Sequence, residues 1–333
     1  MSPALPPHVL EIADLSVSIA TPAGALAAVG GVSYAVRAGE TFAIVGESGC
    51  GKSMSSLAVM GLAPPAARVT ARTCRFDGVE LLGLSRAELS AIRGRHLSMI
   101  FQDPMTALNP VYTIGDQLAE VHRRHLGSSR AAARERAEHL LERVGIRNAG
   151  ARLGQFPHQL SGGLRQRVMI AMALMCGPKL LIADEPTTAL DVTVQARILA
   201  LLRELKRELG MSLVLITHDL GVVAGLADRI AVMYAGRIVE TGSARQIFKA
   251  PAHPYTRGLI ACLPVPGRTP PGGRLQSIPG MVPSLIGDTT GCQYRNRCPH
   301  AQSRCGEEDI ELREAAPGHE YRCALAQAEL AAP

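Results

Sequence analysis

One short glycine-rich stretch places a lysine and a serine at the spacing needed to hold the phosphates of a nucleotide. It reads Gly-Glu-Ser-Gly-Cys-Gly-Lys-Ser over residues 46–53, directly after an apolar strand and before residues 54–60, which suit a helix. Glycines let backbone N–H groups turn toward phosphate oxygens, and a helix start attracts negative charge. We expect Lys52 to reach the β and γ phosphates and Ser53 to ligate Mg²⁺.

Two carboxylates follow a second apolar run. Residues 180–185 read Leu-Leu-Ile-Ala-Asp-Glu, which predicts a buried strand that ends in Asp184 and Glu185 at the sheet edge where the phosphate loop also emerges. Asp184 would belong to the Mg²⁺ shell, and Glu185 would orient and polarise the water that attacks the γ phosphate, because phosphoryl transfer depends on positioning and charge. Taken alone, such a pair is more often an ordinary solvated strand end.

A second candidate phosphate contact lies in residues 160–167, Leu-Ser-Gly-Gly-Leu-Arg-Gln-Arg. Ser161 followed by Gly162 and Gly163 at a helix start offers a hydroxyl and exposed N–H groups to an anion. Because the first loop already serves the nucleotide in one chain, a second site suggests that two chains enclose the same nucleotide. Taken by itself, the pattern would more readily be explained as a plain helix cap with no ligand.

The elements that must position these residues are those of an α/β protein with a strand-rich beginning. Apolar runs bounded by Gly and Pro predict the early strands, helical spacing predicts an inserted helical region, and alternating patterns predict the sheet domain, with a hairpin turn at Ala235-Gly236. The expected strands are residues 15–19, 32–36, 41–45, 180–184 and 213–217, and the expected helices are residues 114–126, 129–144, 165–175 and 192–209.

The composition of the 333 residues excludes several classes of protein. With 47% hydrophobic residues, 19% charged residues and a net charge of +6, the chain is neither disordered, nor fibrous, nor a miniature disulfide scaffold. No apolar stretch is long enough to cross a bilayer, and the first basic residue is Arg37, so we expect neither a membrane span nor a secretory signal and place the chain in the cytosol. Scattered basic residues and 3% aromatics argue against nucleic acid as a partner.

Taken together, these residues make nearly the whole chain resemble the ATPase subunit of an ATP-binding cassette (ABC) transporter. The phosphate loop, Gln102, residues 160–167, the carboxylate pair, Ala189-Leu190-Asp191 and His218 occur in the family's order at similar spacing. The resemblance implies a P-loop NTPase core with an antiparallel β subdomain and a helical subdomain at about residues 103–170. It also implies ATP and Mg²⁺ as ligands.

The resemblance assigns roles to individual residues. Gln102 would sense Mg²⁺ and the transmembrane partner, Asp191 would link the two ATP sites of a dimer, and His218 would contact the γ phosphate. Ile19 stands near the place where the family stacks adenine on an aromatic ring, and Tyr34 has the pattern of a core residue. The implied residues are Glu185, His218, Lys52 and Gln102 for catalysis; Gly46, Glu47, Ser48, Gly49, Cys50, Gly51, Lys52, Ser53, Met54 and Ile19 for ATP; Ser161, Gly162, Gly163 and Gln166 for the partner's ATP; and Ser53, Gln102 and Asp184 for Mg²⁺.

Residues 252–259, Ala-His-Pro-Tyr-Thr-Arg-Gly-Leu, and the proline-rich segment 264–283 resemble the oligopeptide and dipeptide importer ATPases. We expect an ATPase domain over residues 1–245 and an extension over residues 246–333. The resemblance implies a second ATPase subunit in a heterodimer, two transmembrane permease subunits, an external peptide-binding protein and a place on the cytoplasmic face of the inner membrane. A nickel or other small-solute importer and a nucleic-acid-associated ABC ATPase are the alternatives.

Four cysteines in the extension could bind a metal. Cys292, Cys298, Cys305 and Cys323 are separated by five, six and seventeen residues, which by itself favours neither zinc nor iron. The resemblance favours a [4Fe–4S] cluster with a structural role, because the proline-rich segment has little material for a core of its own. Zinc and four unliganded buried thiols are the alternatives.

Overall fold

Two compact units make up the chain, and each draws on separate stretches of sequence. The computed structural model describes residues 8–188, 191–263, 277–287, 290–307 and 309–330. Unit 1 comprises residues 1–9, 36–40 and 77–216, and unit 2 comprises residues 10–35, 41–76 and 217–333. Ala189, Leu190 and most of the proline-rich segment lie outside the described residues.

Three parallel strands form the centre of unit 1. β8 (Leu180–Asp184) pairs with β7 (Leu97–Ile100) on one side and with β9 (Ser212–Thr217) on the other. Every residue of β8 is buried, as in strands that are covered on both faces. Since parallel strands end at the same edge of a sheet, the residues that follow β7 and β8 emerge side by side.

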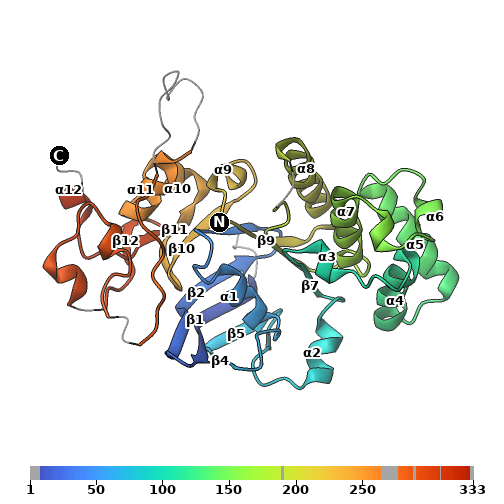
Figure 1. Ribbon diagram of the computed structural model, residues 1–333, viewed down its shortest axis with the longest axis horizontal. Coiled ribbons are helices and arrows are strands. Elements are labelled where there is room, and N and C mark those ends of the chain that lie inside the picture. The colour runs from blue at the N-terminus through green and yellow to red at the C-terminus, as the bar shows by residue number, and fades with distance from the viewer. Residues whose placement is uncertain (1–7, 189–190, 264–276, 288–289, 308, 331–333) are drawn as a thin grey trace, which may run out of the picture. The chain divides into compact units, whose positions relative to one another are not determined.

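The helices of unit 1 begin and end close to the predicted positions. α4 (Ile114–Leu126) and α5 (Arg130–Arg143) pack against each other and against α7 (Gly162–Ala173), as Figure 1 shows in green. The side chains of Thr113 and Ser129 cap α4 and α5 by accepting backbone N–H bonds. The remaining elements are β6 (Val79–Glu80), α2 (Arg86–Ile92), α3 (Pro104–Ala107), α6 (Ala149–Arg152), the 3-10 turn Pro157–Gln159 and α8 (Val192–Leu209).

An antiparallel sheet opens unit 2, and its position confirms the predicted strand-rich beginning. β1 (His8–Thr21) lies beside β2 (Gly24–Arg37) and pairs with β4 (Ala67–Thr70) and β5 (Thr73–Phe76). Leu10, Leu15 and Val17 of β1 are fully buried, so the alternation of apolar residues along the strand builds one face of the core.

Three further strands of unit 2 support the phosphate loop. β3 (Thr41–Val45) pairs in parallel with β10 (Arg229–Tyr234), which forms a hairpin with β11 (Arg237–Ser243). The hairpin turns at Ala235 and Gly236 with φ of 43° and 76°, the positive values typical of a two-residue hairpin turn, so the predicted turn is confirmed. The helix after the loop is α1 (Lys52–Val59).

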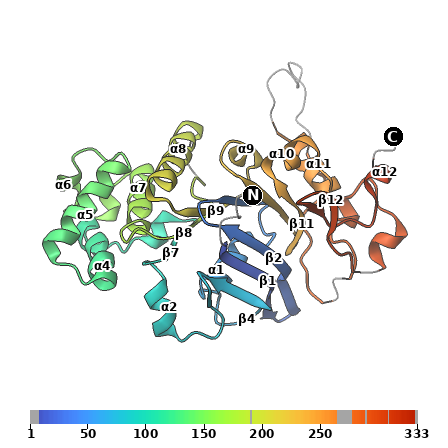
Figure 2. The same cartoon turned by 180° about the vertical axis from the view of Figure 1, so that it is seen from behind.

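The C-terminal extension continues this sheet. β13 (His319–Tyr321) pairs with β11, and β12 (Arg313–Ala316) pairs with β13, both antiparallel; Figure 2 shows these strands from behind. The other elements of unit 2 are α9 (Leu220–Val223), α10 (Ala244–Lys249), α11 (Pro254–Ala261), α12 (Gln327–Leu330) and 3-10 turns at Arg295–Arg297 and Ser303–Gly306.

One buried carboxylate ties the extension to β11. Glu240 is fully buried and accepts the backbone N–H bonds of Ala252 and His253 at 2.7 and 2.8 Å. The Nε2 atom of His319 lies 2.7 Å from the same carboxylate. These contacts satisfy the buried charge, which would otherwise be costly.

An apolar cluster of the extension packs beside these contacts. Its members are Ala252, Tyr321, Cys323, Leu325 and Leu330. Sheet pairing and this cluster of buried side chains hold the C-terminal strands of the extension in place, whereas most of the proline-rich segment, for which little core was expected, lies outside the described residues.

Candidate active site

The phosphate loop runs from the end of β3 to the start of α1. The structure explains why several of its positions require glycine. A Cβ atom at residue 46 would collide with the carbonyl oxygen of Met233, and one at residue 51 would collide with that of Ala28. Gly49 and Gly51 have φ of 80° and 96°, which glycine adopts without strain. The predicted strand, loop and helix are thus confirmed, and the backbone turns as such a loop requires.

Lys52 lies inside this loop. Its side chain is only 4% exposed, and its Nζ donates to the carbonyl oxygens of Gly46 at 2.8 Å and Glu47 at 3.0 Å. The ammonium group therefore holds the first half of the loop from within. A cation in this position attracts phosphate oxygens that approach the loop.

The carboxylate pair follows β8 in unit 1. Asp184 and Glu185 are both more than nine-tenths buried, and Glu185 has a φ of 44°, an uncommon value for a residue with a side chain. The N–H of Glu185 donates to the carbonyl oxygen of Ile216 at 2.9 Å, which fixes this backbone. Strained backbone of this kind persists where surrounding contacts hold it, and it is concentrated at functional sites.

Two side chains orient the Glu185 carboxylate. Gln102, just after β7, donates from Nε2 to Oε2 of Glu185 at 3.1 Å, and the Thr188 hydroxyl donates to the same oxygen at 2.7 Å. The structure thus brings together two residues that sequence reasoning selected, Gln102 and Glu185. Thr188 was missed, although a hydroxyl three residues after a carboxylate is a recognisable local hydrogen-bond pattern.

The glycine pair of residues 160–167 starts α7. Ser161 is the N-cap residue and has extended backbone, yet its side chain makes no capping hydrogen bond and is exposed. A Cβ atom on Gly162 would meet nothing within 4 Å among the described residues. Gln166 is buried and donates from Nε2 to the carbonyl oxygen of Pro186 at 2.6 Å, so it links α7 to the turn after the carboxylates.

The remaining predicted residues occupy separate places. Asp191 caps α8, because its Oδ1 accepts the N–H of Val194 at 2.9 Å. His218 is exposed and directly follows β9. Ile19 lies half-buried on β1, whereas Tyr34 is buried and stacks on Phe42 with ring centroids 5.2 Å apart, as predicted for a core residue.

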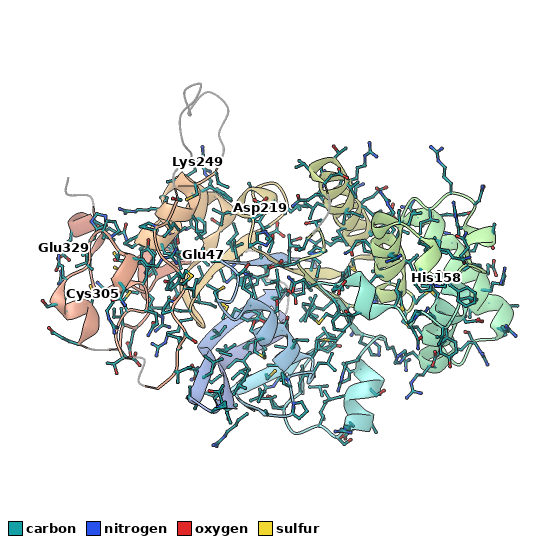
Figure 3. The ribbon with its side chains drawn as sticks, in the orientation of Figure 1. Glu47, His158, Asp219, Lys249, Cys305 and Glu329 are labelled. Atoms are coloured by element: carbon teal, nitrogen blue, oxygen red, sulfur yellow. The ribbon has the colours of Figure 1, made fainter. Side chains whose placement is uncertain are left out.

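The prediction of an iron–sulfur cluster is wrong. Over the part of the chain that the structure describes, no group of three or more His, Cys, Asp or Glu side chains is placed to hold a metal ion, which leaves zinc without ligands there as well. Cys305 (labelled in Figure 3) and Cys323 are buried, and burial raises the pKa of the Cys292 thiol to about 11. Buried thiols such as that of Cys323, which belongs to the apolar cluster of the extension, behave as small apolar side chains.

Family models match two parts of the chain. Residues 29–188 match "ABC transporter", and residues 239–305 match "Oligopeptide/dipeptide transporter, C-terminal region". A dipeptide transport ATP-binding protein, DppD of Bacillus subtilis, is 53% identical over 298 residues, which cover 89% of this chain and 88% of the relative. The chain belongs to the ABC transporter family of ATP-binding proteins.

Further relatives of this ABC protein support the same family. The oligopeptide transport ATP-binding protein OppD of Salmonella typhimurium is 50% identical over 94% of this chain and 92% of its own length. The ATP-binding cassette MJ0796, solved as a dimer bound to ADP and phosphate, superposes with a TM-score of 0.63 at 27% identity and covers 71% of this chain and 99% of its own.

The family membership confirms the expected P-loop fold and the enzyme class. This ABC protein is an ATPase whose ATP hydrolysis is coupled to transport, and ATP with Mg²⁺ is its substrate. None of the helices in the described residues has the length and apolar character that a membrane crossing requires.

Proposed function

We propose that this chain is the ATP-hydrolysing subunit of an importer for dipeptides or oligopeptides, bound peripherally at the cytoplasmic face of the inner membrane. The observation that carries the proposal is the C-terminal match over residues 239–305 on the same chain as a complete set of ABC motifs. The relatives named for dipeptide and oligopeptide transport support the same substrate class. The ATPase domain would end near residue 245, where the extension begins.

The proposed chemistry assigns separate tasks to the two units. In unit 2, Lys52 and the loop N–H groups bind the triphosphate, and His218 contacts the γ phosphate. In unit 1, Glu185 accepts a proton from the attacking water while Gln102 and Thr188 hold its carboxylate. The buried carboxylate of Asp184 and the hydroxyl of Ser53 are hard oxygen ligands that suit Mg²⁺, which neutralises phosphate charge.

The partner subunits have candidate surfaces in unit 1. Three large apolar side chains within ten residues of Gln102 in the sequence are exposed, namely Phe101, Val111 and Tyr112, and the last two are 72% and 56% exposed. Large exposed apolar side chains are available for contact with partner proteins. We propose that the transmembrane permease subunits contact this chain at these residues.

The exposed start of α7 would face a second ATPase subunit. The Ser161 side chain makes no capping hydrogen bond, and the space at Gly162 is open, so a nucleotide bound to another chain can approach closely. An external peptide-binding protein would deliver the cargo to the permeases.

Ser161→Arg is expected to impair ATP hydrolysis in the assembled transporter while sparing ATP binding by this chain's own phosphate loop. The added side chain blocks the space into which the partner's nucleotide would enter, whereas Ser161 belongs to unit 1 and the phosphate loop at residues 46–53 belongs to unit 2. ATP binding to the isolated chain and turnover by the complex are the two measurements. Loss of binding in the isolated chain would contradict the two-chain arrangement.

The substrate class is tested by uptake in cells that lack the gene and carry it back on a plasmid. Labelled dipeptides and longer peptides should accumulate only when the wild-type gene is present, and a Lys52→Ala version should not restore uptake. Free amino acids serve as the control. Restoration of labelled nickel uptake without peptide uptake would replace the peptide proposal with a metal importer.

A further inference from the structure

Two side chains of the C-terminal extension form hydrogen bonds with one residue of the phosphate loop. The residue is Glu47, labelled in Figure 3, and all three belong to unit 2. Its backbone N–H donates to the hydroxyl of Tyr255 at 3.0 Å. Its carboxylate accepts two bonds from the Arg297 guanidinium, Nη1 to Oε2 at 2.7 Å and Nη2 to Oε1 at 3.0 Å. Such paired bonds fix both distance and angle.

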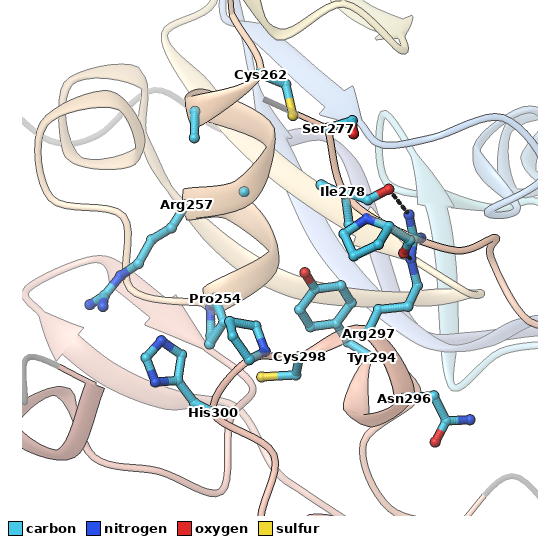
Figure 4. Close-up of a pocket in the computed structure, with 14 residues that line it drawn as sticks. Pro254, Arg257, Cys262, Ser277, Ile278, Tyr294, Asn296, Arg297, Cys298 and His300 are labelled. Atoms are coloured by element: carbon cyan, nitrogen blue, oxygen red, sulfur yellow. Dashed lines mark hydrogen bonds between the residues drawn. The ribbon is translucent and has the colours of Figure 1, made fainter. Parts of the chain in front are cut away.

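Arg297 is itself held firmly. Its Nε donates to the carbonyl oxygen of Pro279 at 2.7 Å, and its Nη2 also donates to that of Ile278 at 3.2 Å, the dashed contact in Figure 4. Its side chain is 5% exposed, against 31% for that of Glu47. The arginine is therefore a fixed part of the extension, and the loop residue is what it positions.

Three tyrosine rings pack next to this contact. The rings of Tyr234, Tyr255 and Tyr294 meet with centroids 4.6 to 5.3 Å apart, and the Arg297 guanidinium lies 5.7 Å from the Tyr234 ring. Aromatic side chains have few rotamers to lose, so the cluster is a rigid base. Tyr294, Arg297 and Cys298 also line a cavity of about 550 Å³ beside α11.

The hydrogen bonds of Arg297 and Tyr255 to Glu47 have two consequences for nucleotide binding. The carbonyl oxygen of Glu47 accepts from Lys52 Nζ, so fixing Glu47 also fixes the cation that faces the phosphates. A carboxylate in a loop that binds a polyanion would repel it, and the guanidinium cancels this charge. The contact therefore sets both the shape and the electrostatics of the loop.

We propose that Arg297 and Tyr255 are positioning residues for ATP binding, through which the C-terminal extension holds the phosphate loop ready for the nucleotide. The inference rests on the proposed ATP site at residues 46–53. It gives the extension a task in the ATPase reaction in addition to its place in the fold. The interaction is intramolecular and needs neither a metal nor the permeases.

The test measures ATP affinity of the full-length chain and the KM and kcat of the assembled complex. Arg297→Gln should weaken ATP binding about tenfold and raise KM for ATP by a similar factor, with kcat within about twofold of wild type. Removing the opposing charge as well, in Glu47→Gln with Arg297→Gln, should restore most of the affinity. Tyr255→Phe keeps the ring and should give a smaller loss.

Arg304→Gln is the matched control, because Arg304 pairs with Glu329 inside the same extension. It should leave ATP affinity unchanged. Wild-type affinity in Arg297→Gln, or a double variant no better than that single variant, would overturn the inference, since a purely structural arginine would not be rescued at Glu47. If Lys52→Ala also binds ATP normally, the proposed site itself has failed, which is a separate result.

Discussion

Glu185→Gln should retain ATP and lose nearly all turnover. The amide has the shape of the carboxylate and can still accept a bond from Thr188, so the strained turn at this residue is preserved. It cannot take a proton from the attacking water. Loss of a general base costs about 100-fold to 10,000-fold in rate, and we expect kcat of the assembled complex to fall within that range. Steady-state ATP hydrolysis and equilibrium ATP binding are the measurements.

Glu88→Gln provides a control in the same unit, because Glu88 is an exposed helix-capping residue of α2. It should turn over ATP at the wild-type rate. Wild-type turnover in Glu185→Gln would instead remove Glu185 from the role of base. Thr188→Ala, which leaves the base but frees its carboxylate, should give an intermediate rate.

The sequence predicts much of the fold because its helices and strands carry their own boundaries. The helix over residues 114–126 and the strand over residues 180–184 coincide with α4 and β8, and the helix over residues 192–209 coincides with α8. Local capping explains this agreement, since Thr113 caps α4, Asp191 caps α8, and Gly210 ends α8 with a φ of 62°. Local signals of this kind need no knowledge of distant residues.

Contacts between distant residues could not be predicted in the same way. Arg297 is 250 residues from Glu47 in the sequence, and no pattern near either residue indicates the pair. The cysteines illustrate the opposite error. Their spacing in the sequence suggested a metal, but spacing fixes neither the direction of a side chain nor its distance from the others, and the described residues provide no metal-binding group.

Lys52→Ala should strongly weaken ATP binding to the isolated chain. The substitution removes the only loop cation between residues 46 and 53, and it also removes the two bonds from Nζ to the carbonyl oxygens of Gly46 and Glu47. We expect affinity to fall about 100-fold or more, because a charge-assisted contact to phosphate and the internal support of the loop are lost together. Direct titration of the isolated chain with ATP measures this.

Lys179→Ala is the matched control, since Lys179 is a half-exposed lysine paired with Asp77 in unit 1. It should bind ATP as the wild type does. Because Lys52 and Arg297 both act on Glu47, their effects should not add: Arg297→Gln should cost less ATP affinity in a Lys52→Ala chain than in the wild type. Fully additive losses would mean that the two cations act on ATP independently. Arg297 would then not act on ATP binding through Lys52.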